Sequence, residues 1–121
     1  MNQKKLVGKT GENIAVKYLK KNGYKIVKRN FLIRQGEIDI IAFKQEVYYF
    51  FEVKARNSTY HGKPVEAVSL QKVKRIKRSA IVFLSFNKIT KYRALSVGVI
   101  SILMDKQSGR ALLRCINNID L

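Results

Sequence analysis

The sequence predicts a single α/β domain in which a mixed central sheet is flanked by helices. Hydrophobic residues recur every three or four positions before residue 23 and after residue 69, as they do in amphipathic helices. Shorter segments rich in β-branched and aromatic residues predict three strands between these helices and two strands after them. A chain of 121 residues, 46% of them hydrophobic, can form one core without disulfides or a structural metal, so we expect one domain over residues 1–121.

The first helix is expected to end at Gly23, a natural helix stop. Its apolar stripe is formed by Val7, Gly11, Ile14, Ala15, Tyr18 and Leu19. Glu12 lies at the edge of this stripe rather than among the lysines, which leaves it free to face a site. The alternative is a carboxylate near the helix N-terminus, favoured by the helix dipole. The strand that follows, over residues 24–34, alternates apolar residues with cations.

Two dense hydrophobic strands, residues 36–42 and 47–56, are separated by a short polar turn and predict a hairpin. They carry three ionisable residues, Asp39, Glu52 and Lys54. Because side chains alternate along a strand, Glu52 and Lys54 share a face, and pairing within the hairpin would bring Asp39 beside them. Buried charges of this kind are unfavourable unless they are paired or bound to a metal.

These residues suggest a metal site that acts on phosphate. Asp39 and Glu52 can hold a divalent cation such as Mg²⁺ or Mn²⁺, with the remaining positions left to water and phosphate. Lys54 can orient the nucleophile or offset the charge that develops on the phosphorane. Glu37 lies on the face of Asp39 and could add a third acid. The alternative is an ordinary ion pair between Lys54 and either acid.

The second helix is expected to follow Ser69, which is placed to cap its N-terminus. Its apolar stripe is formed by Val73, Ile76, Ala80, Phe83 and Leu84. Its other face carries Lys72, Lys74, Arg75, Lys77 and Arg78. So many neighbouring cations exceed what solubility requires and indicate contacts to nucleic acid, to which Arg34 and Arg56 would add. Lys72, near the positive end of the helix, is the one predicted to face the scissile phosphate.

The last two strands are expected over residues 93–102 and 110–116. Residues 47–53 and 95–102 are apolar on both faces apart from the charged pair, so these two strands should be central in the sheet.

The net charge of +17 predicts a polyanionic partner, and nucleic acid is the commonest. An acidic membrane surface and simple solubility remain as alternatives. Tyr48, Tyr49 and Tyr60 are interpreted as exposed side chains able to stack on bases, although packing in the core or a loop is the commoner fate of such tyrosines.

Cys115 is the only cysteine, which excludes a disulfide framework and a cysteine-based metal site, and His61 is the only histidine. With so few partners we expect neither zinc chemistry nor a Ser-His-Asp triad. His61 lies in a polar loop, where a solvated side chain is the favoured interpretation. The sequence shows no signal peptide and no long apolar run, so we expect a cytoplasmic protein without a membrane partner.

Several of these segments resemble the YraN-like proteins, the UPF0102 family. The resemblance is carried by Gly11-Glu12, Gly23-Tyr24, Arg29-Asn30-Phe31, Gly36-Glu37-Ile38-Asp39-Ile40-Ile41-Ala42 and Phe51-Glu52-Val53-Lys54-Ala55-Arg56, and it extends to Gly62, Pro64, Glu66-Ala67-Val68 and Lys72. That family is placed in the restriction-endonuclease-like PD-(D/E)xK superfamily, whose signature is an aspartate and then a glutamate-x-lysine on the next strand. The resemblance therefore implies a restriction-endonuclease-like αβββαβ core with catalytic Asp39, Glu52 and Lys54.

The same arrangement is similar to archaeal Holliday-junction resolvases, which add a glutamate from the first helix, and Glu12 matches that glutamate. One position departs from the family pattern. Family members usually have Arg-Phe-Asp-Val where this chain has Arg93-Ala94-Leu95-Ser96-Val97, so Ser96 replaces the usual aspartate and no role of that acid carries over.

The prediction is an endonuclease dependent on Mg²⁺ or Mn²⁺ that hydrolyses phosphodiester bonds in DNA, including branched or structured DNA. Asp39 and Glu52 are its metal ligands, Lys54 assists the reaction and Glu12 is an auxiliary acid. DNA is favoured over RNA, and a homodimer is compatible with the resemblance because branched-DNA resolvases act as dimers. Two alternatives stay open: a catalytically silent nucleic-acid-binding protein, and an RNA- or ribosome-associated factor that uses only the basic surfaces.

Overall fold

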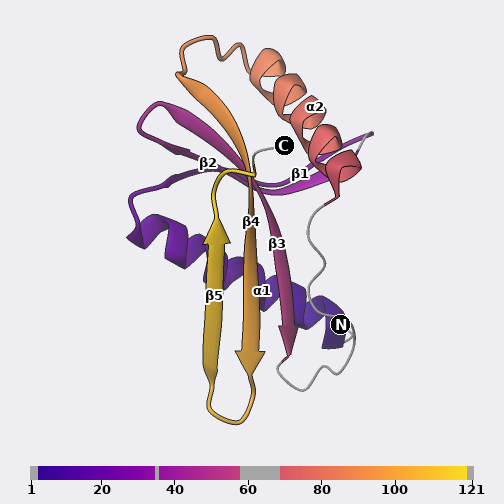
Figure 1. Cartoon of the computed structure of the whole chain (residues 1–121), viewed down its shortest axis with the longest axis vertical. Helices are drawn as coiled ribbons and strands as arrows, with labels where there is room; N and C mark the ends of the chain where they lie inside the picture. Colours follow the sequence, from indigo (N-terminus) through magenta and orange to yellow (C-terminus); the bar gives the residue numbers. More distant parts are fainter. Residues whose placement is uncertain (1–2, 35, 58–68, 120–121) are drawn as a thin grey trace.

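The computed structural model describes residues 3–34, 36–57 and 69–119 and confirms the α/β fold. The elements follow one another as α1 (Gln3–Lys21), β1 (Lys25–Ile33), β2 (Gly36–Lys44), β3 (Val47–Asn57), α2 (Leu70–Phe86), β4 (Ala94–Asp105) and β5 (Arg110–Ile116) (Figure 1). This is the predicted order, and it agrees with an αβββαβ core followed by one further strand. β4 continues to Asp105, past its predicted end at residue 102.

The five strands form one mixed sheet in the order β1-β2-β3-β4-β5. Neighbouring strands are antiparallel except β3 and β4, which run parallel. Parallel neighbours need a crossover connection, and α2 lies in the connection between them. β3 and β4 are interior strands, as their apolar character predicts.

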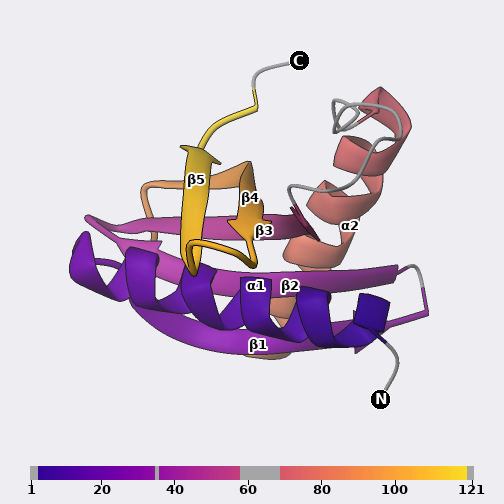
Figure 2. The ribbon, with the colours of Figure 1, turned by 90° about the horizontal axis from the view of Figure 1, so that it is seen from below.

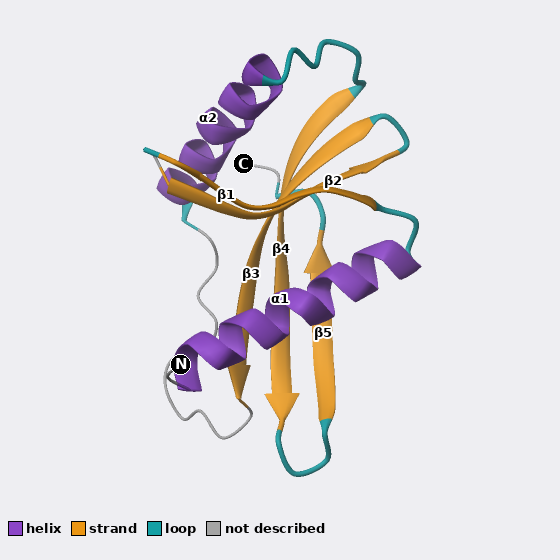
Figure 3. Ribbon diagram, turned by 180° about the vertical axis from the view of Figure 1, so that it is seen from behind, coloured by secondary structure: helices purple, strands orange, loops and turns teal. Residues whose placement is uncertain are grey.

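The helices cover opposite faces of the sheet, so the core has two parts. α1 crosses β3, β4 and β5 on one face, and α2 packs on the other near one end of the sheet (Figures 2 and 3). The core beneath α1 contains Ala15, Val16, Leu19, Tyr24, Ile40, Ala42, Phe51, Ile100 and Ile102. The core beneath α2 contains Ile38, Ile41, Phe50, Val73, Ile76, Ala80, Phe83, Leu84 and Val97.

α1 approaches β3 closely at Gly11, which is buried. A Cβ atom at this position would lie 2.3 Å from the Cβ of Ala55, so only glycine allows the helix to pass. The close approach holds the next residue, Glu12, against the sheet. Glu12 lies in the middle of α1 and not in its first turn, so the helix dipole does not explain this carboxylate.

The β2–β3 hairpin has the predicted short turn, which comprises two residues, but its strands separate before they end. Gln45 and Glu46 both have positive φ, 50° and 65°, as the turn type suited to a tight hairpin requires. Pairing runs from the turn only as far as Ile40 and Phe51. Beyond that pair, the side chain of Asp39 accepts a hydrogen bond of 2.8 Å from the backbone N–H of Val53. The strands therefore leave an opening at Asp39.

Two further predictions concern the cap of α2 and the tyrosines of β3. Ser69 caps α2 as expected, because its hydroxyl accepts a hydrogen bond of 3.1 Å from the backbone N–H of Lys72. The interpretation of Tyr48 and Tyr49 as exposed side chains is wrong, and the structure instead shows the packing that is the commoner fate of such tyrosines. Both are half-buried: Tyr49 stacks on Phe51 with ring centroids 5.8 Å apart, and Tyr48 contacts other aromatic rings. Tyr60 and His61 lie outside the described residues. No described helix is both long and apolar enough to span a membrane.

Candidate functional site

Asp39 lies between two pockets at the opening between β2 and β3. The pocket on the α1 side has a volume of about 520 Å³ and is lined by Gly8, Lys9, Glu12, Arg29, Asn30, Glu37, Asp39 and Val53. The pocket on the α2 side has a volume of about 240 Å³ and is lined by Gly36, Glu37, Asp39, Glu52, Lys72, Arg75, Ile76 and Ser79. Asp39 and Glu37 line both, so a group bound at Asp39 can be reached from either side.

The environment of Asp39 disfavours its negative charge. Burial raises the pKa of Asp39 to about 6, against the opposing effect of the hydrogen bond from Val53. The carboxylates of Glu37, Glu52 and Glu12 contribute smaller increases to this pKa of about 6. A cation bound among these groups would relieve both the burial and the repulsion.

This concentration of acids is unusual for so basic a chain. The protein has 25 lysines and arginines but only eight aspartates and glutamates. Four of those eight acids, Glu12, Glu37, Asp39 and Glu52, interact around Asp39.

Glu52 is the most constrained acid on the α2 side. Its side chain is 14% exposed, and its Oε1 forms an ion pair with the Nζ of Lys72. Its Oε2 is buried and makes no hydrogen bond within the described part of the structure. Such an oxygen is unfavourable unless it binds a ligand. Lys72, predicted to face the phosphate, instead contacts this carboxylate.

Arg75 completes the α2 side, one helical turn after Lys72. Its side chain passes over Gly36, where a Cβ would lie 3.3 Å from the Arg75 Cδ. Gly36 also has a φ of 145°, a conformation that L-residues rarely adopt. The glycine at the start of β2 therefore makes room for a cation at the edge of the pocket.

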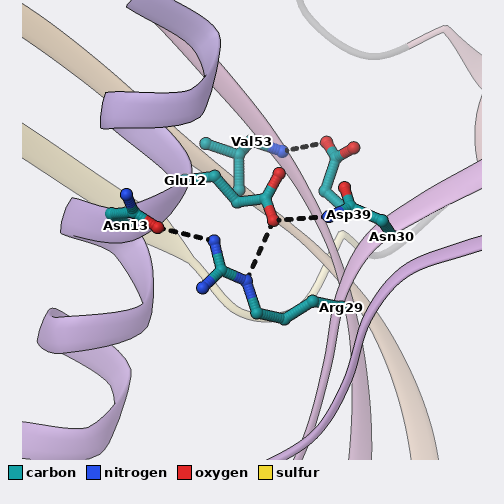
Figure 4. Close-up of polar contacts among 6 residues, drawn as sticks. All are labelled: Glu12, Asn13, Arg29, Asn30, Asp39 and Val53. Carbon is teal, nitrogen blue, oxygen red and sulfur yellow. Dashed lines mark hydrogen bonds and ion pairs between the residues drawn. The ribbon is translucent and has the colours of Figure 1, made fainter.

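Glu12 is held on the α1 side by two residues of β1 (Figure 4). Its Oε1 accepts hydrogen bonds from Arg29 Nε at 3.0 Å and from Asn30 Nδ2 at 3.1 Å. Arg29 also donates to Asn13 Oδ1 at 2.7 Å. Asn30 has a φ of 52°, uncommon for a non-glycine residue within a strand. It lies where β1 passes Asp39, between the paired positions Arg29–Ile40 and Phe31–Ile38.

Neither Arg29 nor Asn30 was predicted to belong to the site, because both lie in a strand whose cations were expected to face solvent or phosphate. The available signal was their presence in the Arg29-Asn30-Phe31 segment of the family resemblance.

The remaining predicted residues do not line the two pockets in the described structure. Lys54 is half-buried on β3, two residues after Glu52, and is absent from the described lining of both pockets. Its role stays a prediction. Arg56 is half-buried near the end of β3, whereas Arg34, Lys77 and Arg78 are exposed. The structure thus brings together Asp39, Glu52, Glu12, Lys72 and Arg75.

The comparisons with known proteins identify the family. Residues 11–102 match the model described as "Uncharacterised protein family UPF0102". The chain belongs to this family. It is 41% identical over 99 residues to a UPF0102 protein of Syntrophomonas wolfei, covering 82% of this chain and 85% of the relative. It is 38% identical over 104 residues to one of Dictyoglomus turgidum, covering 86% of each.

Ser96, where the resemblance led us to expect an aspartate, is distant in register from Glu52. Ser96 is buried on β4 opposite Tyr49, whereas Glu52 lies opposite Val99. Its hydroxyl donates a hydrogen bond of 2.6 Å to the backbone oxygen of Asn117, which anchors the segment after β5. Ser96 lines neither pocket in the described structure.

The carboxylates around Asp39 in this UPF0102 protein are of the kind that can bind a divalent cation. Among the described residues, no group of three or more His, Cys, Asp and Glu side chains is arranged to hold a metal. Mg²⁺, however, is commonly held by one or two carboxylates together with waters and phosphate oxygens. Asp39 and Glu52 line the same pocket and supply two such carboxylates.

Proposed function

We propose that this UPF0102 protein is a metal-dependent nuclease that hydrolyses phosphodiester bonds in DNA. The observation that carries the proposal is the gathering of four of its eight acids around Asp39 in a chain of net charge +17. A nucleic-acid-binding surface has no need of such an acidic centre, because carboxylates repel phosphate. A hydrolytic site does need one, because it must hold a divalent cation against the substrate.

The roles follow from where the side chains lie. Asp39 and Glu52 would hold Mg²⁺ or Mn²⁺. The cation would supply an activated water and would polarise a phosphoryl oxygen as a Lewis acid. Arg75, at the edge of the same pocket, offsets the negative charge that develops on the phosphorus centre. Glu12, fixed by Arg29 and Asn30, is the auxiliary acid on the opposite side of Asp39. Lys54 is proposed to orient the nucleophile.

The substrate proposal combines charge with resemblance. Exposed Arg34, Lys77 and Arg78 are suited to contact the phosphates that flank the cleaved bond. Similarity to Holliday-junction resolvases favours DNA over RNA, branched or structured DNA in particular, and action as a homodimer. The cytoplasmic location expected from the sequence stays part of the proposal.

A catalytically silent nucleic-acid-binding protein is the second candidate. The ion pair between Lys72 and Glu52 favours it, because the protein's own cation already neutralises one of the two metal-binding carboxylates. In that case the acids would be structural, and the basic surface would bind nucleic acid alone.

Cleavage assays separate the two candidates. The protein would be incubated with duplex, single-stranded, flapped and four-way DNA and with structured RNA, in Mg²⁺, Mn²⁺ or EDTA. The nuclease proposal expects metal-dependent cleavage of at least one DNA that Asp39→Asn abolishes. Binding without cleavage under every condition, unchanged by Asp39→Asn, would support the silent binder.

A further inference from the structure

We infer that Lys72 exchanges partners during the reaction: it pairs with Glu52 in the metal-free protein and moves to a phosphate of the bound strand when a divalent cation takes Glu52. This inference rests on the proposed function. It assigns to Lys72 the coupling of metal binding to substrate binding, which neither a fixed structural ion pair nor a permanent phosphate ligand would provide.

The two partners differ in their freedom to move. The Lys72 side chain is 43% exposed, and it extends from a helix start whose backbone is fixed by Ser69. The Glu52 side chain is 14% exposed and projects from the central strand β3. When the pair separates, Lys72 is therefore the member that moves, while Glu52 stays in place to bind the cation.

Electrostatics favour the exchange. Oε1 of Glu52 is occupied by Lys72, and Oε2 is buried without a hydrogen bond in the described structure. A divalent cation on this carboxylate removes the negative charge that holds Lys72 and repels its ammonium group. A phosphate at the mouth of the pocket then provides the nearest new counter-charge. Arg75, which lines the same pocket, also favours an anion there.

The exchange makes a thermodynamic prediction of definite sign. Lys72 competes with the cation for Glu52 in the absence of phosphate, so removing Lys72 should tighten metal binding. A Lys72 that merely orients Glu52 would have the opposite effect, since its loss would weaken metal binding. The exchange also couples the two ligands: bound metal should increase the affinity for phosphate, and bound phosphate should increase the affinity for metal. Thermodynamic linkage requires the two factors to be equal.

The first test measures Mg²⁺ binding alone by calorimetry. Lys72→Met should bind Mg²⁺ about two- to fivefold more tightly than the parent, the range expected for loss of a half-exposed competing ion pair. Lys74→Met is the matched control, because Lys74 is exposed on the same helix and lines neither described pocket. Its Mg²⁺ affinity should stay near that of the parent. Unchanged or weaker binding in Lys72→Met would overturn the exchange.

The second test uses thymidine 3′,5′-bisphosphate as the phosphate probe. Mg²⁺ should strengthen its binding to the parent protein, and Lys72→Met should lose most of that enhancement. Glu52→Gln should release Lys72 without metal, so its metal-free affinity for the probe should exceed that of the parent. Equal metal-free affinities for Glu52→Gln and parent would contradict the exchange even if Lys72→Met did not fold.

Different results would refute the proposed metal site and the exchange of Lys72. If replacing Asp39 does not change the affinity of the protein for Mg²⁺, the proposed metal site is wrong. Both the proposed function and the Lys72 exchange are then refuted. If Asp39-dependent binding is present but Lys72→Met does not tighten it, the exchange alone is wrong and the nuclease proposal stands.

Discussion

Asp39→Asn should stabilise the metal-free protein above about pH 6. The pKa of Asp39 is raised from 3.8 to about 6, mainly by burial. At ~1.36 kcal/mol per pH unit, ionising this carboxyl costs the folded state about 3 kcal/mol. Asparagine keeps the shape, and its side-chain oxygen can still accept the Val53 hydrogen bond. We expect a net gain of about 1–3 kcal/mol, which corresponds to a rise in Tm of roughly 3–10 °C.

The sign of the effect depends on pH. Because the folded pKa is raised, the protonated Asp39 favours folding below the unfolded value, and this contribution is lost as pH rises through about 6. The two proteins should therefore have similar Tm values near pH 4 and diverge by pH 8.

Melting curves in EDTA at both pH values measure this difference, and curves with Mg²⁺ test the metal site. Mg²⁺ should raise the Tm of the parent and leave Asp39→Asn almost unchanged. Glu46→Gln, which neutralises an exposed acid in the β2–β3 turn, is the control and should respond like the parent. If Asp39→Asn melts lower than the parent at pH 8 and keeps the parent's metal response, Asp39 is a structural ion-pair member and the reasoning is refuted.

Three further predictions test the scaffold and the binding surface. Gly11→Ala should lower stability by about 1–3 kcal/mol because the new methyl group meets Ala55, and Ala55→Gly should restore part of the loss in thermal melts. Asn30→Gly should keep the Tm of the parent while Asn30→Ala lowers it, because only glycine adopts the positive φ freely. Both substitutions should reduce cleavage, because both remove the hydrogen bond that Asn30 donates to Glu12. Duplex-DNA affinity should fall steeply with salt, with a log–log slope of about −0.9 per phosphate contact, and replacing Lys77 and Arg78 by alanine should make that slope shallower.

The sequence was sufficient for the order of the elements because each depends on a local pattern. Ser69 caps α2 and the Gln45–Glu46 turn closes the hairpin through contacts between near neighbours in the chain. The burial of Tyr49 was missed because it depends on a distant segment. Tyr24 packs against Tyr49 with ring centroids 5.1 Å apart, and strand periodicity does not predict that contact.

The sequence predicted the part of the site that lies on the β2–β3 hairpin. Asp39 and Glu52 share a pocket because antiparallel pairing of their strands brings them together, and alternation along the strands predicts this. The contact of Lys72 with Glu52 depends on how the crossover sets α2 over the sheet. The positive φ of Asn30 likewise reflects a local irregularity of β1. Neither leaves a periodic signal in the sequence.

The opening between β2 and β3 links the fold to the proposed chemistry. Pairing of these strands ends at Ile40 and Phe51, so the N–H of Val53 has the Asp39 carboxylate as its acceptor instead of a β2 carbonyl. A carboxylate used in this way must sit at the opening, half-buried and close to Glu52 and Glu12, which is why its pKa rises. The hydrogen bond from Val53 leaves most of that unfavourable charge uncompensated. A cation shared by Asp39 and Glu52 would neutralise it and at the same time join the two strands where their hydrogen bonding stops. Metal binding should therefore stabilise this end of the sheet as well as enable hydrolysis, because the same two carboxylates serve both purposes.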